Sequence, residues 1–209
     1  ENLAKDPATV VDLPSNEITW SLVTPNQANY QTDPFLGGSL IKVAEVTTTG
    51  ATTIELTDIQ EDVYNTHFCL YTAKPHATGA DTEHFSMRVS VDNGSSWKAL
   101  SNYGQARQSQ YSGGVLSQNE TSGTAFNYFN AYTNQDQGGG GWYYLHNFGK
   151  SNRYSQITGH GAAGISGSDA QYRFVGGSYK VTEVHNAIQF YKPGGEQYMG
   201  TFTLYGVKE

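Results

Sequence analysis

One octapeptide carries the most specific chemical pattern of the chain. Ser90, Asp92, Gly94 and Trp97 follow the spacing Ser-x-Asp-x-Gly-x-x-Trp. The carboxylate of Asp92 can accept hydrogen bonds from turn amides, and Gly94 can take the positive φ that other residues avoid. Trp97 can then pack back against the two strands that the turn joins. The pattern therefore predicts a closed turn between strands.

The same spacing is known as the Asp box of sialidases and other glycan-processing proteins. There it repeats around a propeller, away from the catalytic centre, whereas this chain has one copy. A sialidase also needs several arginines to hold the carboxylate of its substrate. This chain has only four in its whole length, Arg88, Arg107, Arg153 and Arg173. We interpret Asp92, Gly94 and Trp97 as a structural turn and not as part of an enzyme.

Other nucleophile, acid–base and metal patterns are weak. Ser166 lacks the glycine spacing of a nucleophile elbow, and His160, between two glycines, has no partner motif in the sequence. The six histidines show no paired metal-ligand spacing. The acidic segment 58–62 lacks the rhythm and the glycine of a calcium loop, and we interpret it as a solvated loop. The sequence therefore predicts no catalytic residue, no metal and no cofactor.

Charge and composition exclude several classes of partner. The chain has 12 basic and 19 acidic residues, a net charge of −7, and no basic run, which argues against nucleic acid and against anionic membranes. No stretch approaches the 18 apolar residues of a membrane-spanning helix. Cys69 is the sole cysteine, so no disulfide within the chain is possible, and we expect it to be buried as a small apolar residue.

Strand patterns recur along the chain, while sustained helical periodicity is missing. Many short strands separated by turns predict an all-β, antiparallel sandwich or barrel. The predicted strands are Glu17–Val23, Leu40–Thr48, Thr52–Thr57, Tyr64–Thr72, His84–Asp92, Ser96–Leu100, Phe126–Thr133, Trp142–Phe148, Arg153–Thr158, Gln171–Val175, Tyr179–Glu183, Ala187–Tyr191 and Thr201–Val207.

Aromatic runs are the best candidates for a binding surface. Alternation places Trp142, Tyr144 and Phe148 on one face of their predicted strand, together with His146. One interpretation is a central strand of a sandwich with one core face and one half-covered face. The others are a subunit interface or a glycan-stacking platform, because tyrosine and tryptophan give rigid contact area with a polar tip. Tyr111 is a further candidate for either use.

The two ends of the chain differ in character. Residues 1–16 contain two prolines and no alternation, so we expect an extended arm before a single sandwich domain of residues 17–209. At the other end, Ile188 and Phe190 alternate with polar residues, and Phe202 and Leu204 repeat that pattern after Pro193-Gly-Gly195. Proline followed by glycine is a turn signal, so the sequence predicts a β-hairpin here.

This C-terminal segment resembles the end of many small structural proteins of tailed-bacteriophage virions. They finish in Ile-x-Phe, a short glycine-containing loop and Gly-Thr-Phe-Thr-Leu-Tyr-Gly, which is found here as Gly200-Thr-Phe-Thr-Leu-Tyr-Gly206. The stretches 20–23, 64–71, 85–97, 141–154 and 184–190 also resemble strands of these proteins, so the likeness extends over most of residues 17–208. The segment 34–50 and the glycine run 138–141 depart from it.

The resemblance implies a jelly-roll-like sandwich on a virus particle, assembled as a homotrimer. Members of this group serve as capsid-decoration, head-fibre or tail-fibre proteins. This chain has no heptads and no collagen-like or β-helical repeat with which to build a shaft. We therefore expect a non-enzymatic decoration, or cement, protein on the outer shell, whose partners are its own copies and the major capsid protein or another virion protein. The alternative is a receptor-binding domain of a tail or head fibre that binds host glycan.

Overall fold

The computed structural model describes residues 39–75, 85–111, 113–127, 138–164, 170–195 and 197–208. The chain divides into two compact units, Glu1–Ile41 and Lys42–Glu209, and the architecture below is that of the second, except that its first strand begins at Leu40. The predicted arm and the predicted strand Glu17–Val23 lie outside the described residues, as does most of the predicted strand Phe126–Thr133.

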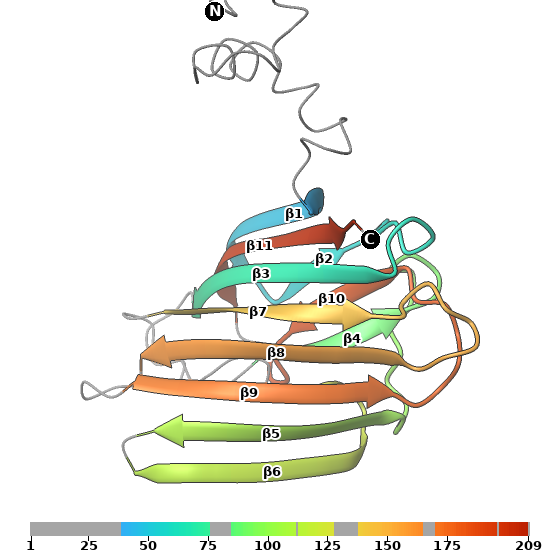
Figure 1. The fold of residues 1–209 in the computed structure, drawn as a ribbon. Helices are drawn as coiled ribbons and strands as arrows, with labels where there is room; N and C mark the ends of the chain where they lie inside the picture. The colour runs from blue at the N-terminus through green and yellow to red at the C-terminus, as the bar shows by residue number, and fades with distance from the viewer. Residues whose placement is uncertain are drawn as a thin grey trace, which may run out of the picture. The chain divides into compact units, whose positions relative to one another are not determined.

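The described part of the chain is all-β and antiparallel, as predicted, with two stacked sheets (Figure 1). The large sheet has eight strands, in the order β1 (Leu40–Ala51), β11 (Tyr198–Val207), β3 (Thr66–Pro75), β7 (Gly139–His146), β8 (Ser155–Gly164), β9 (Ala170–Tyr179), β5 (Tyr103–Tyr111) and β6 (Gly114–Gly123). The small sheet has three strands, in the order β2 (Thr53–Leu56), β10 (Ala187–Tyr191) and β4 (Ser86–Ser90). This division into eight and three strands supports a β-sandwich, whereas the finer jelly-roll prediction is not confirmed.

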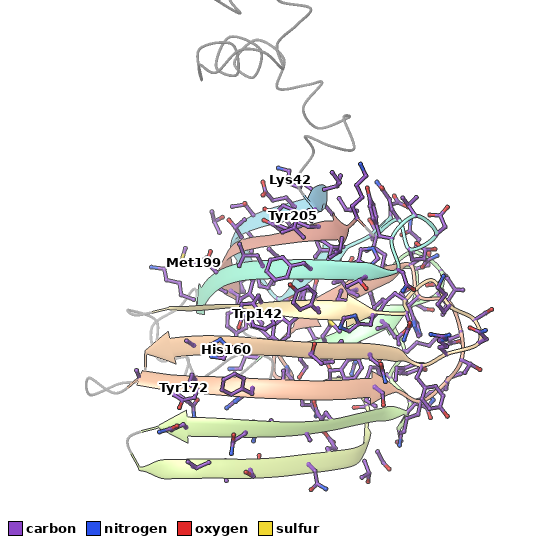
Figure 2. The ribbon with its side chains drawn as sticks, viewed as in Figure 1. Lys42, Trp142, His160, Tyr172, Met199 and Tyr205 are labelled. Atoms are coloured by element: carbon purple, nitrogen blue, oxygen red, sulfur yellow. The ribbon has the colours of Figure 1, made fainter. Side chains whose placement is uncertain are left out.

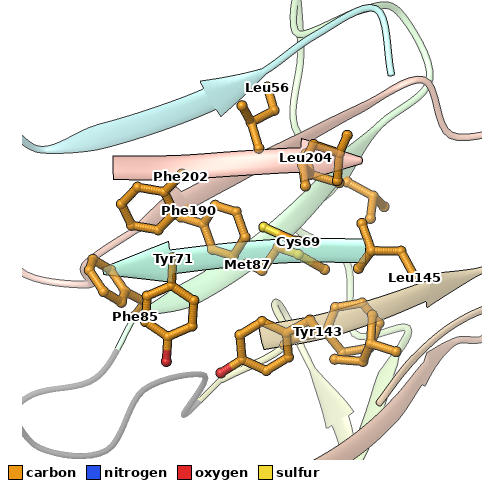
Figure 3. Packing of buried hydrophobic residues seen from close by; sticks show 14 of the residues in the cluster. Leu56, Cys69, Tyr71, Phe85, Met87, Tyr143, Leu145, Phe190, Phe202 and Leu204 are labelled. Carbon is orange, nitrogen blue, oxygen red and sulfur yellow. The ribbon is translucent and has the colours of Figure 1, made fainter. Parts of the chain in front are cut away.

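The core lies between the two sheets, and aromatic side chains fill it (Figure 3). Phe202 of β11 packs on Phe190 of β10, with ring centroids 5.1 Å apart, and on Tyr71 of β3 at 5.7 Å. Cys69 is buried in the same cluster, as predicted, and burial raises the pKa of its thiol to about 12. Alternation along each strand sends one set of side chains into this core and the other set outward.

The predicted C-terminal hairpin is wrong. β10 pairs with β2 and β4 in the small sheet, whereas β11 pairs with β3 in the large sheet. Gly194 and Gly195 do adopt positive φ, at 122° and 80°, but their turn carries the chain from one sheet to the other. The apolar side chains of both strands face the same core, but from opposite sheets. In the sequence, two such strands joined by a turn show the same apolar alternation as a hairpin.

The strands differ from the prediction in three further places. Residues 96–100 form no strand, and residues 171–179 belong to one strand, β9, which ends before residue 180. The hairpin of β5 and β6 was not predicted at all. Its strands carry few apolar residues: β5 buries the polar side chains of Gln105, Arg107 and Ser109 on its inner face. Because this inner face is polar, the strand shows no apolar alternation along the sequence.

Candidate binding site on the outer face of the large sheet

The outer face of the large sheet carries exposed aromatic side chains. In β7, Tyr143 and Leu145 point into the core, so Trp142 and Tyr144 point outward, where they are 37% and 36% exposed. Figure 2 shows Trp142, His160 and Tyr172 on the neighbouring strands β7, β8 and β9 of this face. The face is therefore built by strand alternation and positioned by the core beneath it.

The strand register arranges these outward side chains in two parallel rows that cross the sheet. Directly opposed residues share a row because antiparallel partners have adjacent Cβ atoms. One row contains Leu70, Trp142, His160, Phe174 and Gln108. The next row contains Tyr205, Phe68, Tyr144, Thr158, Gly176 and Ala106.

Over β11, β3 and β7, the two rows form an apolar strip, which we define as Phe68, Leu70, Trp142, Tyr144 and Tyr205. The ring of Phe68 lies 5.1 Å from that of Tyr144 and 6.3 Å from that of Tyr205. Leu70, beside them, is 43% exposed. The strip contains no charged side chain. Neighbouring rings of this kind form a continuous uncharged surface. The cores of protein interfaces have the same composition, rich in aromatic and poor in charged residues.

Over β8, β9 and β5, the same two rows form a trough of about 490 Å³. The side chains of one row, Thr158, Gly176 and Ala106, are small. Trp142 and Phe174 of the other row are large and lie beside them. We call this hollow the outer trough. Its lining consists of Ala106, Arg107, Gln108, Trp142, Thr158, Gly159, Phe174, Val175 and Gly176.

The structure separates the four predicted interface or stacking residues. Trp142 and Tyr144 lie on the outer face, but Phe148 is fully buried in the core and is corrected to a core residue. Strand β7 ends at His146, and Asn147 adopts a positive φ of 63°, which breaks the alternation and turns Phe148 inward. Tyr111 is the last residue of β5, and its side chain lies outside the described part.

Other members of the face were not predicted from the sequence. Phe68 and Tyr205 lie in the predicted strands Tyr64–Thr72 and Thr201–Val207, and they are direct partners across β3 and β11. Phe174 is 51% exposed and Tyr172 38%. Their alternation with Gln171, Arg173 and Val175, which are buried, could have been found from the sequence. The signal in the sequence is a strand whose outward side chains are apolar while some of its inward side chains are polar.

The fold also brings together a serine, a histidine and a glutamate. His185 Nδ1 lies 2.7 Å from the hydroxyl of Ser155, and His185 Nε2 lies 3.4 Å from Glu183 Oε1. Glu183 Oε2 pairs with Lys98 Nζ at 3.1 Å. The three residues come from β8 and from the segment before β10, so spacing along the sequence gave no sign of this cluster.

This cluster does not have the properties of a hydrolase site. Ser155 and His185 are both 0% exposed, and the rings of Phe148 and Tyr179 lie against the imidazole at 5.8 and 5.0 Å. A nucleophilic hydroxyl has to reach its substrate. The ring is also reversed relative to the serine-protease arrangement, in which Nε2 faces the serine. We assign the cluster to the buried framework beneath the turn after β9.

The turn predicted around Asp92 is closed by side-chain hydrogen bonds. The hydroxyls of Ser90 and Ser96 each donate to the Asp92 carboxylate at 2.6 Å, and the Ser96 amide donates to it at 2.9 Å. Gly94 has a φ of 87°, and a Cβ atom there would lie 3.4 Å from Trp97 Cζ2. These hydrogen bonds lower the pKa of Asp92 to about 2. The turn is an exposed local structure that lies away from the outer face.

Replacing Asp92 with asparagine is expected to lower the urea midpoint of unfolding at pH 7. The pKa of Asp92 in the folded protein is about 2, below the ordinary value of 3.8. The carboxylate therefore contributes its full stabilisation above pH 3.8, and this stabilisation is lost as the pH falls through about 2. The difference between the two proteins should therefore narrow below pH 4. Urea titrations at pH 7, 4 and 2.5 test this; a difference that is constant across these conditions would contradict it.

Two other features, a metal centre and a membrane-spanning helix, are absent from the residues that the structure describes. Those residues contain no group of three or more histidine, cysteine, aspartate or glutamate residues that could hold a metal ion. They also contain no helix with the length and hydropathy that spanning a bilayer requires. Comparison of the chain with protein-family models, with curated proteins and with solved structures finds no match. The outer face is therefore interpreted from its own geometry.

Proposed function

We propose that this protein is a non-enzymatic structural component of a tailed-bacteriophage virion, a decoration protein that sits on the outer shell. The observation that carries the proposal is the apolar strip, which joins three neighbouring strands in one uncharged surface. The location on a virion rests on the resemblance of the C-terminal segment to phage structural proteins.

The strip has the composition that a protein–protein contact requires. Aromatic residues dominate the energetics of interfaces because they bury large area with little loss of conformational freedom. A stable interface needs about 800 Å² on each partner, so the strip would form the centre of a larger contact. Its partner in the proposal is the major capsid protein or another virion protein. Homotrimer formation, which the resemblance implies, belongs to the same proposal.

Co-sedimentation with empty capsids of the same phage tests the proposal. The unaltered protein is expected to be a trimer by light scattering and to pellet with capsids. A double variant, Leu70→Ser with Tyr144→Ser, should lose about 2 kcal/mol or more of binding energy, because both side chains lie in the strip. Val115→Ser is the matched control, since Val115 is 60% exposed but lies on β6, and it should bind normally.

Two results would contradict the proposal. One is a protein that does not pellet with capsids, and the other is a double variant that binds as well as the Val115→Ser control. A protein that ignores capsids but attaches to host cells would support the second candidate, a receptor-binding domain of a tail or head fibre. The observation that favours this candidate is the outer trough, whose aromatic wall and small floor suit a glycan better than a flat protein surface.

A further inference from the structure

We propose that the outer trough is a binding site for a short neutral oligosaccharide. The floor of this site lies on β8, β9 and β5, whereas the apolar strip lies on β11, β3 and β7. The two regions share only Trp142. The inference therefore stands whether the protein decorates a capsid or forms a fibre tip.

The floor of the trough is open because its side chains are small. Thr158, Gly176 and Ala106 are consecutive members of one cross-strand row. A Cβ atom on Gly176 would meet only the carbonyl oxygen of Ile157, at 3.8 Å, so no side chain fills the space above this glycine. Three neighbouring strands lie about 10 Å across from first to last. The floor is thus long enough for more than one sugar ring.

The wall of the trough presents aromatic surface and hydrogen-bonding groups together. Trp142 and Phe174 rise beside the floor, and the ring of His160 lies between them, 6.2 and 4.7 Å from theirs. Gln108 and Thr158 bring an amide and a hydroxyl to the lining. A pyranose ring has one face of C–H groups and a rim of hydroxyls. Aromatic side chains stack on the C–H face, and polar side chains form hydrogen bonds with the hydroxyls.

The charge of the lining selects against ionic ligands. Arg107 is the one charged residue among the lining residues that the structure describes, and it is only 8% exposed because it points to the inner face of β5. Phosphate or carboxylate groups are recognised through accessible arginine or lysine side chains. The trough offers none, whereas neutral sugar hydroxyls match its amide and hydroxyl groups.

Saturation-transfer NMR and titrations of the full chain test the inference. The probes are maltotriose, cellotriose and tri-N-acetylchitotriose, then an array of neutral bacterial glycans, with 3′-sialyllactose as the acidic comparison. We expect at least one neutral glycan to bind and to shift the indole N–H resonance of Trp142. Gly176→Val fills the floor without a backbone clash, and valine also suits a strand better than glycine. This variant should stay folded and lose at least about tenfold in affinity.

Ala162→Val is the matched control, because Ala162 is exposed on β8 of the same face but does not line the trough. It should bind the glycan as the unaltered protein does. The inference is overturned if no neutral glycan binds, if only 3′-sialyllactose binds, or if Gly176→Val binds normally. Co-sedimentation of Gly176→Val with capsids should be unchanged, so a failure here is distinguishable from a failure of the decoration role.

Discussion

Replacing Phe202 with alanine is expected to lower the free energy of unfolding by about 3–5 kcal/mol, the range for a large aromatic removed from a packed core. Phe202 is 0% exposed, and its ring lies 5.7 Å from Tyr71, 5.5 Å from Phe85 and 5.1 Å from Phe190. These residues come from both sheets, so the cavity would open at the contact that holds the sandwich together. Denaturant unfolding followed by tryptophan fluorescence measures the loss.

Phe174→Ala is the matched control for this prediction, because it makes the same substitution on the other side of the same sheet. Phe174 is 51% exposed and packs on His160 and Tyr172, so its loss should lower stability by about 1 kcal/mol, well below the effect of Phe202→Ala. Equal losses in the two variants would contradict the division into a buried inner face and an open outer face. Since that division defines the outer trough, the pair of variants also tests the premise of the site.

The antiparallel all-β fold could be predicted because its core strands alternate plainly. In β4, Met87 and Val89 face the core, and in β11 Phe202 and Leu204 do so. What alternation cannot tell is which sheet a strand joins. Ile188 and Phe190 of β10 show the same pattern as β11, yet they belong to the small sheet. That choice depends on contacts between distant segments, which a local pattern does not contain.

The candidate site was predictable only in part for the same reason. Trp142 and Tyr144 stood out within one strand, whereas the trough needs the register of four strands to bring Phe174 and Gly176 beside them. Phe148 was misplaced because one residue with positive φ, Asn147, reverses the expected face. The β5–β6 hairpin, which supplies Ala106 and Gln108, was missed because its inner face is polar.

Acidification from pH 7 to 4.5 is expected to destabilise the protein through His185. Burial lowers the pKa of His185 to about 4 from its ordinary value of 6.5, and this effect outweighs the opposing attraction of Glu183. The unfolded chain therefore binds a proton that the folded chain excludes. The contribution of neutral His185 to the free energy of unfolding is fully present above pH 6.5 and is lost as the pH drops toward 4. The full shift corresponds to a loss on the order of 3 kcal/mol.

The pH dependence of His185→Gln separates this residue from other groups that titrate in the same range. His67 is also buried with a lowered pKa, so the variant should retain part of the slope. At pH 7 it should be less stable than the unaltered protein, because it loses the hydrogen bond to Ser155, yet the two should converge as pH falls. Glu183→Gln should have the opposite effect and steepen the slope, since the carboxylate favours the charged imidazole. Parallel slopes in all three proteins, measured by urea titration at pH 7, 5.5 and 4.5, would show that His185 is not the group responsible.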